Sequence, residues 1–263
     1  MSETINYQVD GDSIATLSID LKDRSMNVIT RQFLEELTEC VDKVVSDPAV
    51  KGAIITSGKT SFLAGADLKG VADLFAARDA EELFNNGMKF VALTRKMETG
   101  GKPFVAAMTG TALGGGLELA MACHMRVVSE NAKLGLPEVS LGVIPGYGGT
   151  QRLAQLVGKG KAFEMIVTAD MITAQDAYKW GLANYVTKQE DLLTKCFEIT
   201  AKITTKSPTA IKTAIKVINA GYNNKLNGFE VEIEEFGKSF GTKDFKEGVG
   251  AFMDKRKPEF KGE

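Results

Sequence analysis

The sequence contains few of the residues that build metal sites and disulfides. Its 263 residues include one histidine, one tryptophan, six prolines and three cysteines. One histidine without clustered partners cannot form a zinc site of the usual kind, so we expect no metal. Cys40, Cys123 and Cys196 are odd in number and lie far apart. This spacing predicts reduced structural thiols in a reducing, cytoplasmic compartment.

Long apolar runs and an excess of positive charge are also missing. No run approaches the ~18 apolar residues of a membrane helix, and the first residues lack the pattern of a signal or transit peptide. The net charge of −2 argues against a general nucleic-acid surface, which needs a basic excess. We therefore expect neither a membrane nor a nucleic acid as partner. With 44% apolar residues, the chain can bury a large core.

The order of apolar patterns predicts an α/β protein. Asp-Gly at 10–11 lies between two apolar runs, which is a strong hairpin signal. Strands are expected at 5–9, 14–19, 52–55, 104–108 and 126–128, and helices at about 30–45, 80–97 and 114–123. Units of strand, loop and helix in series indicate a largely parallel sheet.

The pattern changes to purely helical after about residue 190. Helices are expected at about 191–205, 208–220, 225–239 and 244–254. Pro208 after Ser207 marks one helix start, because proline is favoured at the first helical position. We predict two regions: 1–190 as the core that holds the active site, and 191–263 as a helical region for oligomerisation.

Two tempting motifs are rejected. Gly58-Lys59-Thr60 resembles the end of a phosphate-binding loop, but the upstream glycine is misplaced and no capped helix follows. Ser239 lies in a G-x-S-x-G pattern, but a hydrolase triad needs a histidine after the serine. The only histidine, His124, lies far upstream, so we interpret Ser239 as structural.

Three glycines followed by a glutamate form the most informative local motif. Gly114-Gly115-Gly116 leads into an apolar segment that contains Glu118. The structural interpretation is a tight strand-to-helix turn with close packing. The functional interpretation is that backbone N–H groups at a helix start face developing negative charge. A glutamate among leucines and alanines needs a reason to be buried.

Two further segments have the same mixed character. Glu138 lies in an apolar stretch, followed by a loop rich in glycine and then a helix with Arg152. It could instead be a capping glutamate or an ion-pair partner of Arg152. The segment 62–69 contains Ala64, Gly65 and Ala66, which let a ligand approach the backbone closely, and Asp67, which alone predicts a helix N-cap.

Together these motifs resemble the enoyl-CoA hydratase (crotonase) family. Ser-Phe-Leu-Ala-Gly-Ala-Asp-Leu at 61–68, Ala-Leu-Gly-Gly-Gly-Leu-Glu-Leu-Ala at 112–120 and Leu-Pro-Glu-Val at 136–139 occur in the family's order. They precede Ile-Pro-Gly-Tyr-Gly-Gly-Thr-Gln-Arg-Leu at 144–153. The resemblance spans essentially the whole chain. It implies a crotonase-like spiral of repeated ββα units with a C-terminal helical trimerisation region.

The resemblance implies a role for each candidate residue. Glu118 would activate water and Glu138 would donate a proton to Cα, while the N–H groups of Ala66 and Gly115 would form an oxyanion hole. The activity implied is hydration of trans-2-enoyl-CoA in fatty-acid β-oxidation or a related pathway, with no cofactor besides the coenzyme A of the substrate. Enoyl-CoA isomerase and a non-catalytic CoA-binding relative remain alternatives.

The resemblance also suggests a wider set of substrate contacts. Residues expected to bind coenzyme A or the acyl group are Arg24, Met26, Ala64, Gly65, Asp67, Leu68, Lys69, Pro137, Gly142, Tyr147, Phe252 and Lys255. Lys255 would reach coenzyme A on a neighbouring subunit of a trimer or hexamer, although a solvated tail explains 255–257 equally well. Relatives often carry a smaller residue at Tyr147, which leaves acyl length open. A 3-hydroxyacyl-CoA dehydrogenase is a possible pathway partner.

Overall fold

A six-stranded sheet forms the centre of the molecule in this computed structural model, which describes residues 3–67 and 80–263. Its strands lie in the order β1-β2-β3-β4-β6-β9. Their bounds are β1 (Ile5–Val9), β2 (Ile14–Ile19), β3 (Gly52–Ser57), β4 (Phe104–Met108), β6 (Met125–Ser129) and β9 (Tyr185–Thr187). Strand β1 is antiparallel to β2, as the hairpin signal predicts, and the other neighbours are parallel.

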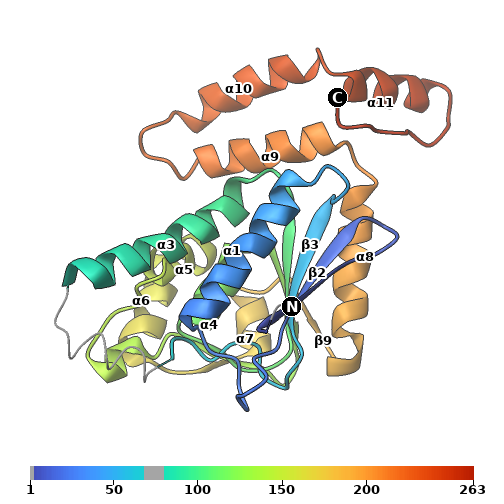
Figure 1. Cartoon of the computed structure of the whole chain (residues 1–263). Coiled ribbons are helices and arrows are strands. Elements are labelled where there is room, and N and C mark those ends of the chain that lie inside the picture. Colours follow the sequence, from blue (N-terminus) through green and yellow to red (C-terminus); the bar gives the residue numbers. More distant parts are fainter. Residues whose placement is uncertain (1–2, 68–79) are drawn as a thin grey trace.

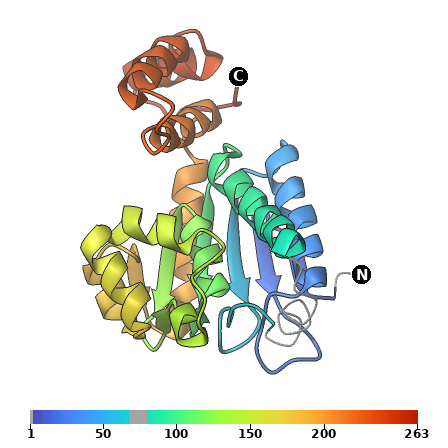
Figure 2. The same cartoon turned by 90° about the vertical axis from the view of Figure 1, so that its left-hand side faces the viewer.

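Helices cover both faces of this sheet (Figures 1 and 2). Successive residues of a strand point to opposite faces. Accordingly Ile55 packs in a cluster with residues of α1 (Arg31–Ser46) and α3 (Ala80–Thr99), whereas Ile54 packs with α8 (Leu192–Thr204). Helix α1 begins where predicted, because the Thr30 hydroxyl accepts the N–H of Phe33 at 3.1 Å.

A second sheet of three short strands was not predicted from the sequence. It contains β5 (Ala112–Leu113), β7 (Lys133–Gly135) and β8 (Ile172–Thr173), in the order β5-β7-β8. Strands of two or three residues are too short to show an alternating pattern. The sheet has a consequence for the site, because β5 leads into α4 (Gly115–Ala122) and β7 leads into η1 (Glu138–Leu141). Pairing of β5 with β7 therefore brings the two candidate glutamates together.

The remaining elements lie after η1. They are α5 (Gly149–Val157), α6 (Lys159–Thr168), α7 (Ala174–Lys179), η2 (Gln189–Asp191), α9 (Pro208–Ala220), α10 (Gly228–Ser239) and α11 (Lys243–Met253). Helix α9 starts at Pro208 as expected, with the Ser207 hydroxyl accepting the N–H of Ala210. Helices α9, α10 and α11 stack beyond one end of the sheet, and α8 connects them to it (Figures 1 and 2). The predicted boundary at residue 190 stays a prediction.

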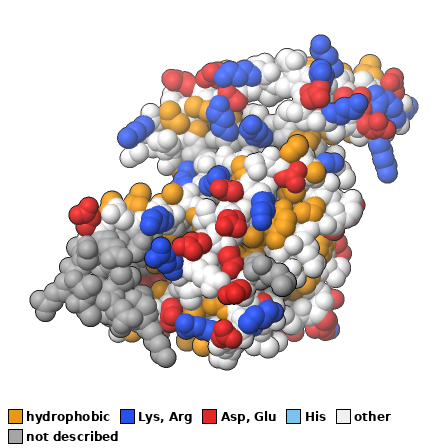
Figure 3. All heavy atoms as spheres, viewed as in Figure 1, with side chains coloured by type: hydrophobic (Ala, Val, Ile, Leu, Met, Phe, Trp, Pro, Cys, Tyr) orange, Lys and Arg blue, Asp and Glu red, His pale blue; other side chains and the backbone are white. Residues whose placement is uncertain are grey.

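The surface shows no face of one charge sign in the view of Figure 3. Lysine and arginine side chains alternate there with aspartate and glutamate side chains. Among the described residues, no helix is long and apolar enough to cross a membrane.

Candidate active site

The glycines before α4 allow two backbone segments to touch. A Cβ atom on Gly116 would lie 2.0 Å from the carbonyl oxygen of Leu63, so only glycine fits there. Gly114 has φ +51°, a conformation that side chains rarely adopt. The structural interpretation of the three glycines is therefore correct, and it also brings segment 63–67 against the start of α4.

This contact places two candidate oxyanion donors near each other. Ile29 forms a parallel bridge with Ala66, donating its N–H to Gly65 O and accepting the N–H of Asp67. Ile29 thus bonds to the residues on either side of Ala66. In such a parallel bridge the N–H of the residue between them points away from the partner strand, so the Ala66 N–H points away from Ile29. A Cβ atom on Gly65 would lie 3.8 Å from the nitrogen of Gly115. Gly115 opens α4, where N–H groups have no intrahelical acceptor.

Glu118 is held inside the protein by backbone donors. All eight residues of α4 are buried, and Glu118 is 1% exposed. Its Oε1 accepts the N–H of Tyr147 at 2.8 Å and the N–H of Gly149 at 2.7 Å. Tyr147 lies in the glycine-rich loop before α5, and Gly149 is the first residue of α5. This segment therefore supplies the two backbone donors that hold the Glu118 carboxyl group. Glycine is needed at 149, since a Cβ there would lie 2.8 Å from Oε1.

Burial changes the ionisation of this carboxyl group. It raises the pKa of Glu118 to about 7, and the two backbone N–H donors and the positive charge of Arg152 oppose that rise. The negative charge of Glu138 adds to the rise, which shows that the two carboxyl groups interact. Glu118 can therefore exchange a proton near neutral pH, as a general base must.

Glu138 also lies close to the glycine turn. It is the first residue of η1, and a Cβ atom on Gly114 would lie 2.8 Å from its Oε1. Its Oε2 is buried and has no hydrogen-bond partner among the described residues. Partial burial raises the pKa of Glu138 above that of an exposed carboxyl group. An orphaned buried carboxyl oxygen is costly unless a substrate or water uses it.

Arg152 does not pair with Glu138, so that alternative for Glu138 is wrong. Its Nε lies 2.6 Å from Glu98 Oε1 on α3, and its Nη2 donates to the hydroxyl of Thr94. Its Nη1 donates to the carbonyl oxygen of Tyr147 at 2.9 Å. Arg152 thus holds the loop whose N–H groups bind Glu118, a role that the sequence pattern did not reveal.

Two residues expected to bind coenzyme A, Arg24 and Met26, lie beside segment 63–67. Arg24 makes a two-pronged ion pair with Asp67, with N–O distances of 3.1 and 2.7 Å. Met26 is 51% exposed and precedes Asn27, whose carbonyl oxygen accepts the N–H of Ala64. Leu68 and Lys69, which belong to the same predicted set, lie outside the described residues, and so does the helix that Asp67 was expected to cap.

Three more residues of the predicted set lie around η1 and in the glycine-rich loop before α5. Pro137 precedes η1 and Gly142 ends it with φ +77°. The ring of Tyr147 lies against Gly115, because a Cβ atom on that glycine would be 3.1 Å from Tyr147 Cδ2. Pro137 and Gly142 thus border the turn that carries Glu138, and Tyr147 lies beside Gly115; contact of these residues with a substrate stays a prediction.

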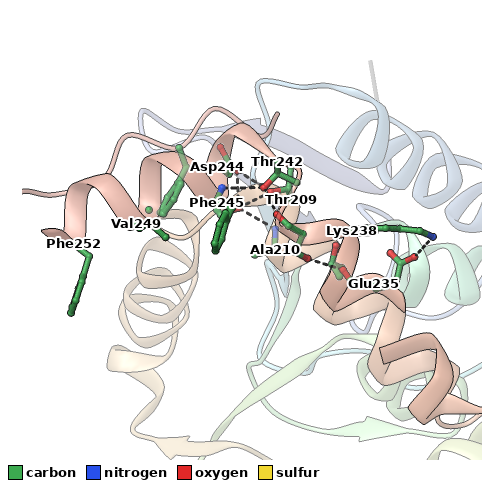
Figure 4. Close-up of a pocket in the computed structure, with 14 residues that line it drawn as sticks. Thr209, Ala210, Glu235, Lys238, Thr242, Asp244, Phe245, Val249 and Phe252 are labelled. Atoms are coloured by element: carbon green, nitrogen blue, oxygen red, sulfur yellow. Dashed lines mark hydrogen bonds and ion pairs between the residues drawn. The ribbon is translucent and has the colours of Figure 1, made fainter. Parts of the chain in front are cut away.

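Phe252 and Lys255 lie in a different part of the chain. Phe252 is on α11, is 82% exposed and lines a cavity of about 420 Å³ among α9, α10 and α11 (Figure 4). Lys255 is exposed just after α11. No candidate acid–base residue lines this cavity. The expectation that Phe252 and Lys255 complete a neighbour's site stays a prediction.

The rejected motifs have structural roles. Ser239 donates its hydroxyl to the carbonyl oxygen of Glu235, and Lys59 pairs with Asp20. His124 Nδ1 accepts the N–H of Phe104 at 3.0 Å. Within 3–67 and 80–263, no cluster of three or more histidine, cysteine, aspartate or glutamate residues could hold a metal ion.

Comparisons with known proteins agree with this geometry. The family model described as enoyl-CoA hydratase/isomerase matches residues 11–263. A crotonyl-CoA hydratase from Syntrophomonas wolfei is 42% identical over 251 residues, which are 95% of each chain. A short-chain-enoyl-CoA hydratase from Clostridium acetobutylicum is 37% identical over 94% of this chain and 93% of that protein. The crystal structure of an enoyl-CoA hydratase from Bacillus anthracis superimposes with a TM-score of 0.91 at 34% identity, covering 99% of this chain and 100% of that one. This chain has the crotonase fold and belongs to the enoyl-CoA hydratase/isomerase family.

Proposed function

We propose that the chain is an enoyl-CoA hydratase, which reversibly adds water to a trans-2-enoyl-CoA to give a 3-hydroxyacyl-CoA. One observation carries the proposal: the buried carboxyl group of Glu118 and the half-buried carboxyl group of Glu138, both with raised pKa values, lie beside the glycine turn that begins α4. The names of the relatives from Syntrophomonas wolfei and Clostridium acetobutylicum support it.

The N–H groups of Ala66 and Gly115 would bind the thioester oxygen. When water adds to the double bond, negative charge moves onto that oxygen. Two fixed donors stabilise the charge without reorganising, which makes such a hole a large contributor to catalysis. Gly115 suits this role because it is the first residue of α4, where the helix dipole favours negative charge.

The two glutamates would move the protons. Glu118 takes a proton from water as the water oxygen forms a bond to C3, and the C2–C3 π electrons move towards the thioester. Glu138 gives its proton to C2, which completes the 3-hydroxyacyl product. Hydration leaves Glu118 protonated and Glu138 ionised, so a proton must pass from Glu118 to Glu138, directly or through water, before the next turnover.

A double-bond isomerase is the second candidate. It would use the same oxyanion hole but only move a proton from C2 to C4, which converts a 3-enoyl-CoA into the conjugated 2-enoyl-CoA. Hydration is favoured because the site holds two carboxyl groups, Glu118 on α4 and Glu138 beside Gly114, so that one can serve water and the other C2. A non-catalytic CoA-binding relative would have no need for the costly buried carboxyl group of Glu118 or for the unpaired buried oxygen of Glu138.

The setting of the reaction is part of the proposal. The substrate brings coenzyme A, and no further cofactor is needed. We place the reaction in β-oxidation or a related acyl-CoA pathway, where a 3-hydroxyacyl-CoA dehydrogenase would consume the product. The three free, buried cysteines suit a reducing compartment such as the cytoplasm. The exposed apolar side chains of α10 and α11 suit a homo-oligomer, a trimer or a hexamer.

Crotonyl-CoA tests this function directly. Purified protein should remove the absorbance of the conjugated thioester, and mass spectrometry should find a product heavier by one water. An isomerase would leave crotonyl-CoA unchanged and instead create conjugated absorbance from a 3-enoyl-CoA. A protein that binds crotonyl-CoA in calorimetry but changes neither substrate would contradict the proposal.

A further inference from the structure

Asn27 is a fully buried polar residue in the connection between β2 and α1. Its side-chain oxygen accepts the N–H of Leu21 at 3.1 Å. Its side-chain nitrogen donates to the carbonyl oxygen of Ile19 and to the hydroxyl oxygen of Ser57, both at 2.9 Å, and lies 3.3 Å from the carbonyl oxygen of Phe62. A buried amide with partners on both of its ends is a firm constraint, because every bond left unmade costs free energy.

The partners of this amide come from three separate parts of the chain. Ile19 ends β2 and Ser57 ends β3, whereas Phe62 leads into the segment that carries the first proposed oxyanion donor. The Ser57 hydroxyl donates in turn to the carbonyl oxygen of Ser61 at 2.6 Å. The side chain of Asn27 therefore ties the ends of two central strands to the start of the donor segment.

The backbone beside Asn27 holds the same segment further along. The carbonyl oxygen of Asn27 accepts the N–H of Ala64 at 2.9 Å. Two residues later, Ile29 brackets Ala66 with hydrogen bonds of 2.8 and 3.1 Å through its own N–H and carbonyl oxygen. The position of Ala66 thus depends on where residues 27–29 lie. That stretch belongs to neither sheet, and the Asn27 side chain supplies its hydrogen bonds to the ends of β2 and β3.

The opposite edge of the donor segment is bonded to the chain that leads into α4. The N–H of Phe62 donates to the carbonyl oxygen of Thr111 at 3.0 Å, and the N–H of Leu113 donates to that of Leu63 at 3.1 Å. Gly115, the second proposed donor, follows two residues after Leu113. The spacing between the two donors therefore depends on hydrogen bonds along both edges of the segment, and Asn27 serves the edge that has no sheet behind it.

We propose that Asn27 is a positioning residue for the hydration, because its side chain sets the place of the Ala66 N–H relative to the Gly115 N–H. The inference rests on the proposed hydratase function, and Asn27 acts in it through Ala66 and not by contact with the substrate. Misplacement of a reacting group by about 1 Å can cost roughly 10²-fold in rate. Loss of a whole oxyanion donor costs ~10²–10³-fold, so displacement of one donor should lie at or below the lower end of that range.

Three variants test the role of the amide. Asn27→Asp keeps the shape of the side chain but lacks the amide N–H groups, and kcat for crotonyl-CoA should fall by roughly 10- to 100-fold. Ser57→Ala removes one of the acceptors and should lower kcat in the same direction by a smaller factor. Thr200→Val is the control: Thr200 on α8 is also fully buried, and its hydroxyl bonds only within that helix, to Cys196. This variant should keep the parent kcat.

A spectroscopic readout separates positioning from a general loss of stability. Acetoacetyl-CoA has no conjugated double bond to hydrate in its keto form. In its enolate, formed when C2 loses a proton to solvent, negative charge is shared by both carbonyl oxygens and the molecule absorbs in the near ultraviolet. Donors aimed at the thioester oxygen stabilise this enolate. With the protein saturated, the absorbance per bound molecule should fall by roughly threefold or more in Asn27→Asp and stay unchanged in Thr200→Val.

The outcomes distinguish this inference from the proposed function. An unchanged kcat or an unchanged enolate absorbance in a folded Asn27→Asp protein would overturn the inference, and so would equal losses in Thr200→Val. If circular dichroism shows that Asn27→Asp does not fold, Ser57→Ala decides by the same two measurements. A parent that stabilises the enolate, and loses this ability in Asn27→Asp, but hydrates no enoyl-CoA would contradict only the proposed function.

Discussion

Helices α4 and α10 each place side chains against the usual rule, and they do so in opposite ways. Helix α4 is buried along its whole length and includes a carboxyl group, Glu118. Helix α10 exposes Phe229, Ile233 and Phe236 by 83%, 67% and 61%. A buried charge is costly unless chemistry uses it, and exposed apolar rings are costly unless something covers them. We therefore propose the first as a reaction site and the second as a contact surface between subunits.

Removing the two proposed acid–base carboxyl groups should have the largest effect. Glu118→Gln and Glu138→Gln keep the shape of the side chains but cannot transfer a proton. Loss of one general acid or base typically lowers the rate by ~10²–10⁴-fold, and we expect this in kcat for crotonyl-CoA. Glu234→Gln, on the exposed side of α10, is the matched control and should leave kcat unchanged.

Near-parent kcat in either variant would mean that the carboxyl group removed takes no part in the reaction. Circular dichroism and sedimentation of the same samples establish that the fold and assembly persist, so a loss of rate is then a loss of chemistry.

The backbone donor at the start of α4 comes next. Gly115→Pro deletes the N–H at a helix position where proline is otherwise accepted. Loss of one oxyanion donor typically costs ~10²–10³-fold in kcat. Because a Cβ on Gly115 would lie 2.5 Å from Ile29 Cδ1, both the proline and its control are made with Ile29→Val, which removes that atom.

The control is Gly115→Ala with Ile29→Val, since alanine adds the same Cβ but keeps the N–H. The proline variant should be slower than the alanine variant by the full factor above. Equal kcat values in the two would mean that the Gly115 N–H does not face the oxyanion.

The cost of the buried charge should also be visible in stability. The pKa of Glu118 is raised from about 4.5 to about 7, so folding favours the protonated carboxyl group. Each pKa unit corresponds to about 1.4 kcal/mol, so the parent should lose roughly 3 kcal/mol as pH rises through this interval. Glu118→Gln should lack that loss. Urea unfolding at pH 5 and pH 8 measures it, and a parallel pH dependence of parent and variant would contradict the raised pKa.

The sequence motifs of the candidate site could be recognised from the sequence, whereas the contacts that hold these motifs in place could not. Gly114–Gly116, Glu118 and Glu138 were identified because small residues and isolated carboxylates in apolar runs are unusual. The Arg152–Glu98 pair joins helices 54 positions apart, and the stack of Phe90 on Tyr147 spans a similar separation. Nothing local in the chain reports such contacts. The strands β5, β7 and β8 escaped prediction for a related reason, since they exist only through pairing with one another.

The exposed stripe of α10 should control assembly. Phe229→Lys with Ile233→Glu places charges where we expect another subunit, while the fold of the single chain makes little use of these exposed side chains. The variant should sediment as a smaller particle with an unchanged circular dichroism spectrum. Glu230→Gln with Glu234→Gln, on the same helix, should keep the parent size. A monomeric parent at micromolar concentration would contradict the assignment of α10.

The smallest effect is expected for Lys255, which would connect the proposed contact surface between subunits with the coenzyme site of a neighbour. Arg256 is held by Glu247 of the same chain at 2.6 and 2.9 Å, which leaves the exposed Lys255 as the better candidate for a neighbour's coenzyme phosphates. A surface ion pair contributes about 0.2–1 kcal/mol, so Lys255→Ala should weaken coenzyme A binding by at most roughly fivefold, and less at high salt. Lys257→Ala is the charge-matched control. If Lys255 acts across subunits, its removal should have no further effect once the α10 variant has dissociated the protein, because the contact is then already lost. Independent, additive losses of affinity in calorimetry would instead place Lys255 beside its own chain's coenzyme.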